Sequence, residues 1–232
     1  MPVWPGLLLL ADSRLPAGGH AHSGGLEAAV TAGSVTGLDD LAIFLRGRLA
    51  TAGLVSAGLA AAACQHATGS ASGEPTRWPA LIAEAAARTT SPAQRRSACA
   101  QGRALLRAGR AAWPGPVLDA LAAAAVADGC YHPVVLGACA SAAGGAPADA
   151  AMIAATASVT GPAAAAVRLL GLDPLAVHGL LAGLTSAVAS VAWSAADAAA
   201  TDDWAALPAA ASPGLDLFAE RHATEAVALF ES

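Results

Sequence analysis

The chain has 232 residues, of which 56% are hydrophobic and only 12% are charged, and its formal net charge is −5. A chain of this length buries about 70% of the surface that its unfolded form exposes, which predicts one domain or at most two. All twelve basic residues are arginine. The negative net charge argues against a general nucleic-acid binder, which needs excess positive charge to neutralise phosphates.

The first distinctive segment runs from Leu7 to Glu27 and reads LLLLADSRLPAGGHAHSGGLE. Its glycine and proline residues predict a backbone path that a plain helix cannot follow, because glycine permits positive φ and proline fixes φ while lacking a donor. We expect no signal peptide here, since the N-terminus lacks a basic region and Asp12 ends the apolar run.

Two helices are expected next. Residues 27–32 predict a short helix that ends at Gly33, and Thr36-Gly-Leu-Asp39 resembles a capping box that opens a long helix to about His66. Apolar side chains follow this second helix near a period of 3.6 residues. Residues 67–76, ATGSASGEPT, are of low complexity and predict a flexible loop.

An arginine-rich helix follows the loop. Ser91-Pro92-x-Gln94 supplies an N-cap and a proline at the first helical position, which predicts a helix over about 92–110. Four of its arginines recur at near-heptad spacing and form one stripe: Arg96, Arg103, Arg107 and Arg110. Such a stripe is either a solvated face that pairs with acidic neighbours or a docking strip for an acidic partner.

Proline and glycine breaks divide the next part of the chain into four expected helices, which cover about 117–127, 132–143, 148–170 and 174–199. Within the last of them, residues 175–196 reach the length of about 20 that a bilayer requires. Its small residues, His178 and the flanking acids Asp173 and Asp197 favour a buried central helix of a water-soluble protein. A helical membrane-associated protein remains the alternative.

The last expected element is an amphipathic helix near 213–230. Leu215, Phe218, His222, Ala226 and Leu229 recur at steps of three or four residues and form one apolar stripe. No stretch of useful length alternates with a period of two. The sequence therefore predicts an all-α fold, with one domain over residues 1–232 built as a bundle of eight to ten helices.

Candidate chemistry is sparse. His20 and His22 stand two residues apart, so in extended backbone both imidazoles point to one side, where they could share a metal ion. The other interpretation is structural: His22 and Ser23 are hydrogen-bonding groups of a turn. With no lysine a phosphate-binding P-loop is excluded, and no G-x-S-x-G elbow occurs. We therefore expect no catalytic site. Four cysteines without a C-x-x-C pair predict reduced, buried thiols.

Three segments, in order, resemble the UreF family of urease accessory proteins. The family's N-terminal signature, D-S-x-L-P-x-G-x-x-x-H-S-x-G-L-E, aligns without a gap onto Asp12 to Glu27; residues 132–170 are similar to its central block; and the tail matches at His222, Leu229, Phe230 and Ser232. The chain departs from the pattern at His20 and Gly24, where the family usually has an aromatic residue, and at Ala228 and Glu231, where it usually has basic ones.

The resemblance implies an all-helical maturation chaperone that assists nickel insertion into urease without a cofactor or catalysis of its own. It implies a cytoplasmic homodimer that binds a UreD/UreH accessory protein, recruits the GTPase UreG and presents it to the urease apoprotein, with no nucleic acid or membrane as partner. Carried over position by position, the partner-binding or structural residues are Asp12, Pro16, Gly18, His22, Ser23, Gly25, Leu26, Glu27, Arg168, His222, Leu229, Phe230 and Ser232.

Overall fold

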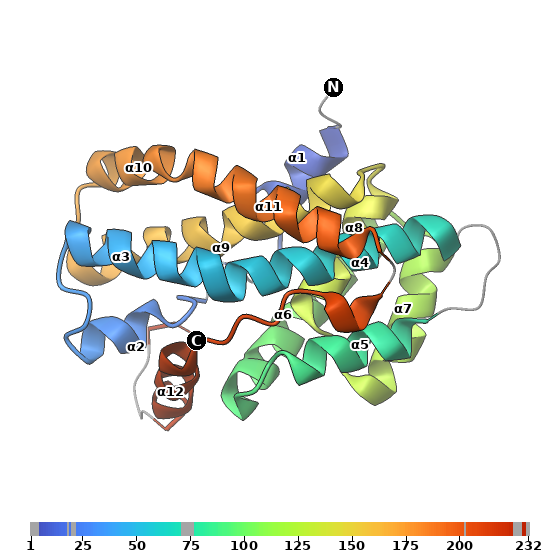
Figure 1. Ribbon diagram of the computed structural model, residues 1–232, viewed down its shortest axis with the longest axis horizontal. Helices are drawn as coiled ribbons and strands as arrows, with labels where there is room; N and C mark the ends of the chain where they lie inside the picture. Colours follow the sequence, from blue (N-terminus) through green and yellow to red (C-terminus); the bar gives the residue numbers. More distant parts are fainter. Residues whose placement is uncertain are drawn as a thin grey trace.

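A computed structural model describes residues 5–17, 19, 22–70, 77–201, 203–224 and 229–230, with the side chains of 70, 127 and 128 excepted. Within these residues the chain is all-α, as predicted, and forms no strand (Figure 1). The helices are α1 (Pro5–Ala11), α2 (Leu26–Thr31), α3 (Leu38–Arg48), α4 (Leu54–Ser70), α5 (Trp78–Ala87), α6 (Pro92–Ala112), α7 (Pro116–Asp128), α8 (His132–Ala142), α9 (Pro147–Leu170), α10 (Pro174–Gly183), α11 (Thr185–Ala199) and α12 (Pro213–His222).

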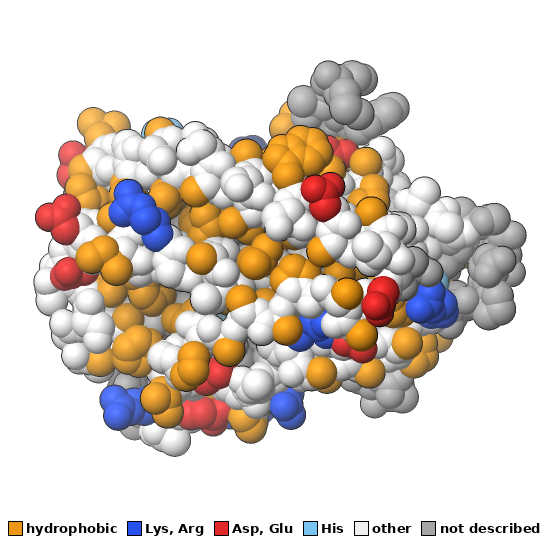
Figure 2. Space-filling model, in the orientation of Figure 1, with side chains coloured by type: hydrophobic (Ala, Val, Ile, Leu, Met, Phe, Trp, Pro, Cys, Tyr) orange, Lys and Arg blue, Asp and Glu red, His pale blue; other side chains and the backbone are white. Residues whose placement is uncertain are grey.

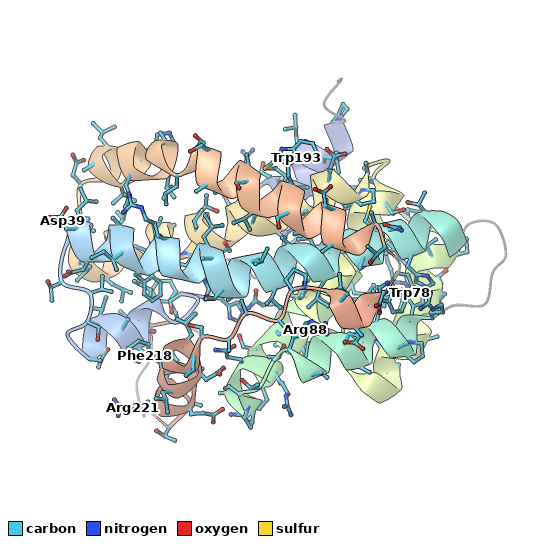
Figure 3. The ribbon with its side chains drawn as sticks, viewed as in Figure 1. Asp39, Trp78, Arg88, Trp193, Phe218 and Arg221 are labelled. Atoms are coloured by element: carbon cyan, nitrogen blue, oxygen red, sulfur yellow. The ribbon has the colours of Figure 1, made fainter. Side chains whose placement is uncertain are left out.

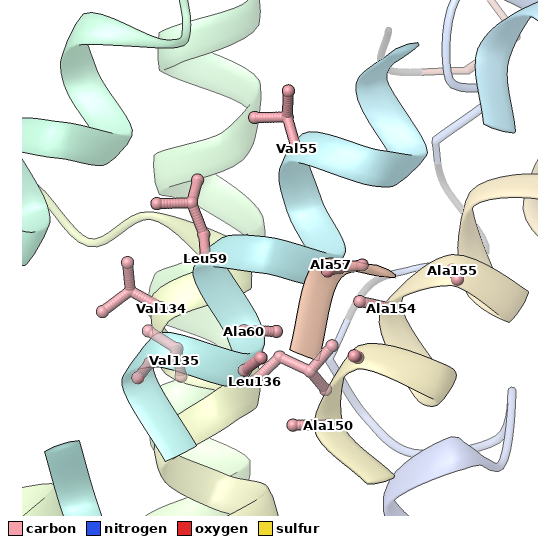
Figure 4. Packing of buried hydrophobic residues seen from close by; sticks show 14 of the residues in the cluster. Val55, Ala57, Leu59, Ala60, Val134, Val135, Leu136, Ala150, Ala154 and Ala155 are labelled. Atoms are coloured by element: carbon pink, nitrogen blue, oxygen red, sulfur yellow. The ribbon is translucent and has the colours of Figure 1, made fainter. Parts of the chain in front are cut away.

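Helix α4 lies at the centre of the fold and packs against α8, α9 and α11 (Figures 1 and 4). Its alanines are almost fully buried, and small side chains allow helices to approach closely. The contact with α8 is tightest at Gly137, where an added Cβ atom would lie 2.1 Å from the carbonyl oxygen of Ala60. Glycine is therefore required at this crossing for steric reasons.

The long central helices account for much of the apolar excess in the composition. Helix α3 continues into α4 through a π-helical turn at Leu49–Gly53. By length and composition two helices could cross a bilayer, Leu38–Gly69 and Pro147–Leu170, and their most apolar windows are 61% and 50% buried inside the protein. At least half of each window therefore packs on other helices.

The helix expected over 174–199 is divided and is not central. Helices α10 and α11 meet at Leu184 with a bend of 47°. Gly179 and Gly183 weaken helical continuity here, because glycine loses more conformational entropy in a helix than other residues. Leu175 is 81% exposed on α10 and Trp193 is 58% exposed on α11. This break, together with the short α1, raises the number of described helices above the expected eight to ten.

Two further predicted boundaries need correction. Helix α4 extends through Ser70, into the segment expected as a loop, and Thr68 Oγ anchors this end by hydrogen bonds to Cys64 O and Ser141 Oγ of α8; residues 71–76 lie outside the described part of the chain. The tail helix ends at His222 rather than near 230. The backbone N–H groups of Leu229 and Phe230 bind a side chain of α2 instead of helical carbonyls.

Helix α6 agrees with its prediction. It begins at Pro92, and the side chain of Ser91 accepts a hydrogen bond from the Gln94 N–H at 3.1 Å. The cysteine prediction holds for Cys64, Cys130 and Cys139, which are free and buried, whereas Cys99 is half-buried. Burial raises the pKa of Cys64 and Cys139 to about 12, so both thiols stay protonated at neutral pH.

Candidate partner-binding site

Glu27, in the first turn of α2, is a buried carboxylate with two backbone partners from the other end of the chain. Its side chain is 9% exposed. Oε1 accepts the N–H of Leu229 at 2.8 Å and Oε2 accepts the N–H of Phe230 at 3.0 Å. Hydrogen bonds to an ionised acceptor are stronger than neutral ones. The N-terminal segment thus holds the end of the tail directly.

His222 and Arg168 complete this contact. The Nε2 of His222 lies 2.9 Å from the carbonyl oxygen of Phe230 and 3.5 Å from Oε2 of Glu27. The tautomer with a proton on Nε2 donates to the carbonyl oxygen. On the other side, the guanidinium of Arg168 from α9 lies 4.4 Å from the centroid of the Phe230 ring, at cation–π distance. We name Glu27, Arg168, His222, Leu229 and Phe230 the tail clasp.

The residues before Glu27 position it. Ser23 is fully buried, and its Oγ accepts the Glu27 N–H at 3.2 Å, which satisfies one donor of the first turn of α2. Gly25 has φ +88°, a conformation that side chains rarely adopt, and an added Cβ would lie 3.2 Å from Leu215 of α12. Leu26 is completely buried in the core. The glycine therefore lets the turn fit against α12.

His22 reaches a different element. Its Nδ1 lies 3.1 Å from Ser97 Oγ on α6, a contact of the kind that the structural interpretation of His22 requires. Its predicted partner in a metal site, His20, lies outside the described residues. Among the residues that are described, no three histidine, cysteine or acidic side chains group where they could hold a metal ion.

The other predicted site residues do not join the tail clasp. Asp12 pairs with Arg14 at the surface, with 2.6 Å between Oδ2 and Nη2, and the hydrogen bonds from Arg14 lower the pKa of Asp12 to about 2. Pro16 is exposed. Gly18 and Ser232 lie outside the described part of the chain. Asp12 and Pro16 of the signature thus lie at the surface, whereas Glu27 at its end belongs to the clasp.

Sequence reasoning missed Glu220, which fixes α12 to α6. Its Oε1 accepts hydrogen bonds from Ser91 Oγ and from the Ala93 N–H, and these bonds hold its pKa below the ordinary value. A carboxylate at a helix N-terminus satisfies free N–H groups and complements the helix dipole. The partners are more than 120 residues apart, so no local signal in the sequence reveals the contact.

The tail clasp opens onto a groove of about 670 Å³ between α6 and the chain end. Phe230 and His222 form one wall, and three arginines of α6 form much of the other: Arg95, Arg96 and Arg103. All three arginines are exposed, and Arg95 donates to the carbonyl oxygens of Thr89 and Thr90. The groove thus combines an apolar floor with positive charge.

The predicted arginine stripe serves two purposes. Arg110, at its end, pairs with Asp119 of α7, with Nη2 to Oδ1 at 2.7 Å, as expected for a solvated face. Arg96 faces Glu220 and lowers its pKa. Both Arg96 and Arg103 line the groove beside the tail. The solvated-face interpretation therefore applies at Arg110, and the docking interpretation stays a prediction for Arg96 and Arg103.

The family model and the relatives found by comparison with known proteins indicate the same family. A family model described as UreF matches residues 35–185. The chain is 44% identical over 226 residues to the urease accessory protein UreF of Mycobacterium sp. (strain JLS), with 97% of each chain covered. It is 42% identical over 227 residues to that of Mycolicibacterium vanbaalenii and 38% identical over 226 residues to that of Mycobacterium tuberculosis, again at 97% coverage.

Proposed function

The chain belongs to the UreF family of urease accessory proteins, and from this premise we propose that it bridges a UreD/UreH accessory protein and the GTPase UreG during urease maturation. In this role it promotes insertion of nickel into the urease active site. Nickel is the cargo of the assembly, and the chain catalyses no reaction itself.

The observation that carries this proposal is the geometry of the tail clasp. Leu229 is 77% exposed, while the neighbouring Phe230 is 7% exposed and fixed by Glu27, His222 and Arg168. An exposed apolar side chain whose neighbouring residue is already held in place loses little conformational entropy on binding, which favours affinity. The clasp therefore supports a role for the chain end as a partner contact.

The positive charge of the arginine-lined groove supports the same proposal. Arg96 and Arg103 present guanidinium groups beside an apolar floor. Complementary charge speeds encounter and selects among partners, and apolar contact at the centre supplies affinity. We assign the groove to an acidic, partly apolar surface of UreG or of the UreD/UreH protein.

We also propose a homodimer in the cytoplasm. Exposed large apolar side chains occur on α3, α10 and α11, at Ile43, Leu175 and Trp193. Figure 2 shows hydrophobic side chains spread over this face of the molecule, and Figure 3 places Trp193 on the side of the view opposite α12. We propose that they belong to a second apolar surface, away from the tail. Exposed apolar patches of this kind are typical of protein contacts. Release of the chain from membranes by carbonate would support the cytoplasmic assignment, and retention would favour the membrane-associated alternative.

The direct test is co-purification. The chain is expressed with its UreD/UreH and UreG counterparts, the complex is captured through a tag on UreG, and mass is measured by light scattering after size exclusion. We expect a stoichiometric complex that contains this chain. A chain that is helical by circular dichroism, yet is absent from the captured material, would refute the bridging role.

A further inference from the structure

A second cavity, of about 300 Å³, shares Ser97 with the tail groove and faces α4, α6, the start of α8 and residues 209–216. Its polar wall includes Arg48, Gln94, Ser97, Gln101, Tyr131 and His132. Sites for small molecules begin at about 300 Å³ and combine apolar walls with a few placed polar groups. The cavity therefore has the size and the lining of a small-ligand site.

Arg48, at the end of α3, gives this cavity its charge. Its Nη1 donates to the Gly24 carbonyl oxygen at 2.7 Å and its Nε to the Ser158 carbonyl oxygen at 3.0 Å. A guanidinium has five N–H donors, so three remain beyond these two bonds. No carboxylate of the described chain pairs with Arg48, and burial alone lowers its pKa to about 10, so it remains charged at neutral pH.

Arg88 is the second arginine on the wall (Figure 3), and contacts within the chain compensate its guanidinium charge. It pairs with the Glu84 carboxylate, four residues earlier on α5. It also donates to five backbone carbonyl oxygens, those of residues 84, 204, 205, 207 and 208. Arg88 thus binds its own chain fully, in contrast to Arg48.

The other titratable groups on the wall do not compensate the charge of Arg48. Burial and, to a smaller extent, His22 lower the pKa of His132 to about 4, so this imidazole is neutral at pH 7. Asp216 on the wall accepts the Thr90 hydroxyl at 2.7 Å and contributes nothing to the shifted pKa of Arg48. Of the two arginines on the wall, Arg48 is the one that no carboxylate of the described residues pairs, and this favours an anion, since a buried charge is costly unless it is paired.

We propose that this cavity binds a small oxyanion of the carboxylate or phosphate class, held by the free guanidinium donors of Arg48. The planar fork of arginine matches both classes in a two-bond geometry. Gln94, Gln101 and Tyr131 lie on the same wall, and their side chains carry neutral donors that suit the remaining oxygens. The ligand would tie α3 to α6 and to residues 209–216.

The test uses the full chain at pH 7.5 with two probes, inorganic phosphate and malonate, each compared with sodium chloride at equal ionic strength. The thermal unfolding midpoint and the heat of binding are measured against probe concentration. We expect a saturable rise of the midpoint for at least one probe. A response to phosphate alone assigns the phosphate class, and a response to malonate alone assigns the carboxylate class. No saturable response beyond that of chloride would overturn the proposal.

Variants distinguish binding in the cavity from a general effect of positive charge. Arg48→Gln should weaken binding at least tenfold, whereas Arg46→Gln, which removes an exposed arginine two positions earlier on the same helix, should bind as the unmodified chain does. Because Arg48 also binds two backbone carbonyls, Gln101→Leu provides a variant with unchanged charge and should weaken binding severalfold. Equal loss in the Arg46 variant, or unchanged binding in both cavity variants, would place the anion elsewhere.

Discussion

Glu27 is the residue at which the two ends of the chain meet, and its carboxylate has two oxygens that each accept one backbone N–H. Glu27→Gln keeps the shape but replaces one acceptor with an NH₂ group, which cannot accept. A buried N–H left without its partner costs about 1–3 kcal/mol. We expect a loss of this size in the free energy of unfolding, measured by urea denaturation.

The control for that substitution is Asp197→Asn, which removes the same charge from an exposed position on α11. It should change the free energy of unfolding by less than about 0.5 kcal/mol. Equal effects of the two substitutions would mean that net charge, rather than the tail clasp, sets the stability measured for Glu27→Gln.

His132 should make the fold sensitive to moderate acid. Its pKa falls from the ordinary value of 6.5 to about 4 in the folded chain, so between these values the unfolded chain binds more protons. The contribution of His132 to the free energy of unfolding is therefore fully present above pH 6.5. It is lost as the pH falls towards 4, by up to about 3 kcal/mol. Urea denaturation from pH 7.5 to pH 4 should show this slope, and His132→Gln should flatten it.

A titration of His132 observed by NMR at its ordinary pKa would contradict that prediction. The prediction depends on burial at the start of α8 and on the neighbouring His22, and neither is visible locally in the sequence. The sequence located the His132-Pro133 helix start correctly. It gave no sign that the imidazole faces a cavity shared with Arg48.

Helix starts were the most predictable elements, because they depend on adjacent residues. The Ser91-Pro92 capping pattern predicts the start of α6, and the proline break predicts the start of α10 at Pro174. Helix ends were less predictable, because they depend on distant contacts. Helix α12 ends at His222, and the N–H groups of Leu229 and Phe230 bind Glu27, about 200 residues away in sequence.

The crossing of α4 and α8 provides a prediction at the level of helix packing. Gly137→Ala places a methyl group 2.1 Å from the Ala60 carbonyl oxygen, so the two helices must separate. Overpacking of a close-packed core costs about 1–3 kcal/mol, and sometimes more. We expect a loss of at least this size in the free energy of unfolding, with a lower thermal midpoint.

Gly179→Ala is the matched control, since it adds the same methyl group within α10, where an added Cβ meets nothing within 4 Å. Replacing glycine by alanine inside a helix stabilises it by about 0.5–1 kcal/mol. The two substitutions should therefore shift the free energy of unfolding in opposite directions. Equal shifts would mean that the α4–α8 crossing is looser than the structure shows.

Across the whole molecule, the order of motifs along the chain predicted the family and the all-α fold but not how the motifs meet. The signature and the tail resemble the family as separate segments, yet in the fold Glu27 and His222 lie 3.5 Å apart. Proximity of this kind depends on the path of every helix between the segments. The apolar composition is likewise explained only by the fold, which buries much of α4 and α9 and leaves Leu175, Trp193 and Leu229 exposed.

These exposed side chains form two separate surfaces in our proposal, one on the tail for accessory partners and one on α10 and α11 for a second copy. Leu229→Asp should abolish capture by UreG and leave the homodimer intact, because the added charge lies beside the groove. Leu175→Asp, a matched change at 81% exposure, should weaken the homodimer and preserve capture. Light scattering after size exclusion measures the homodimer, and capture through a tag on UreG measures partner binding. If either substitution removed both properties, partner binding would require the dimer, and the two surfaces would act as one.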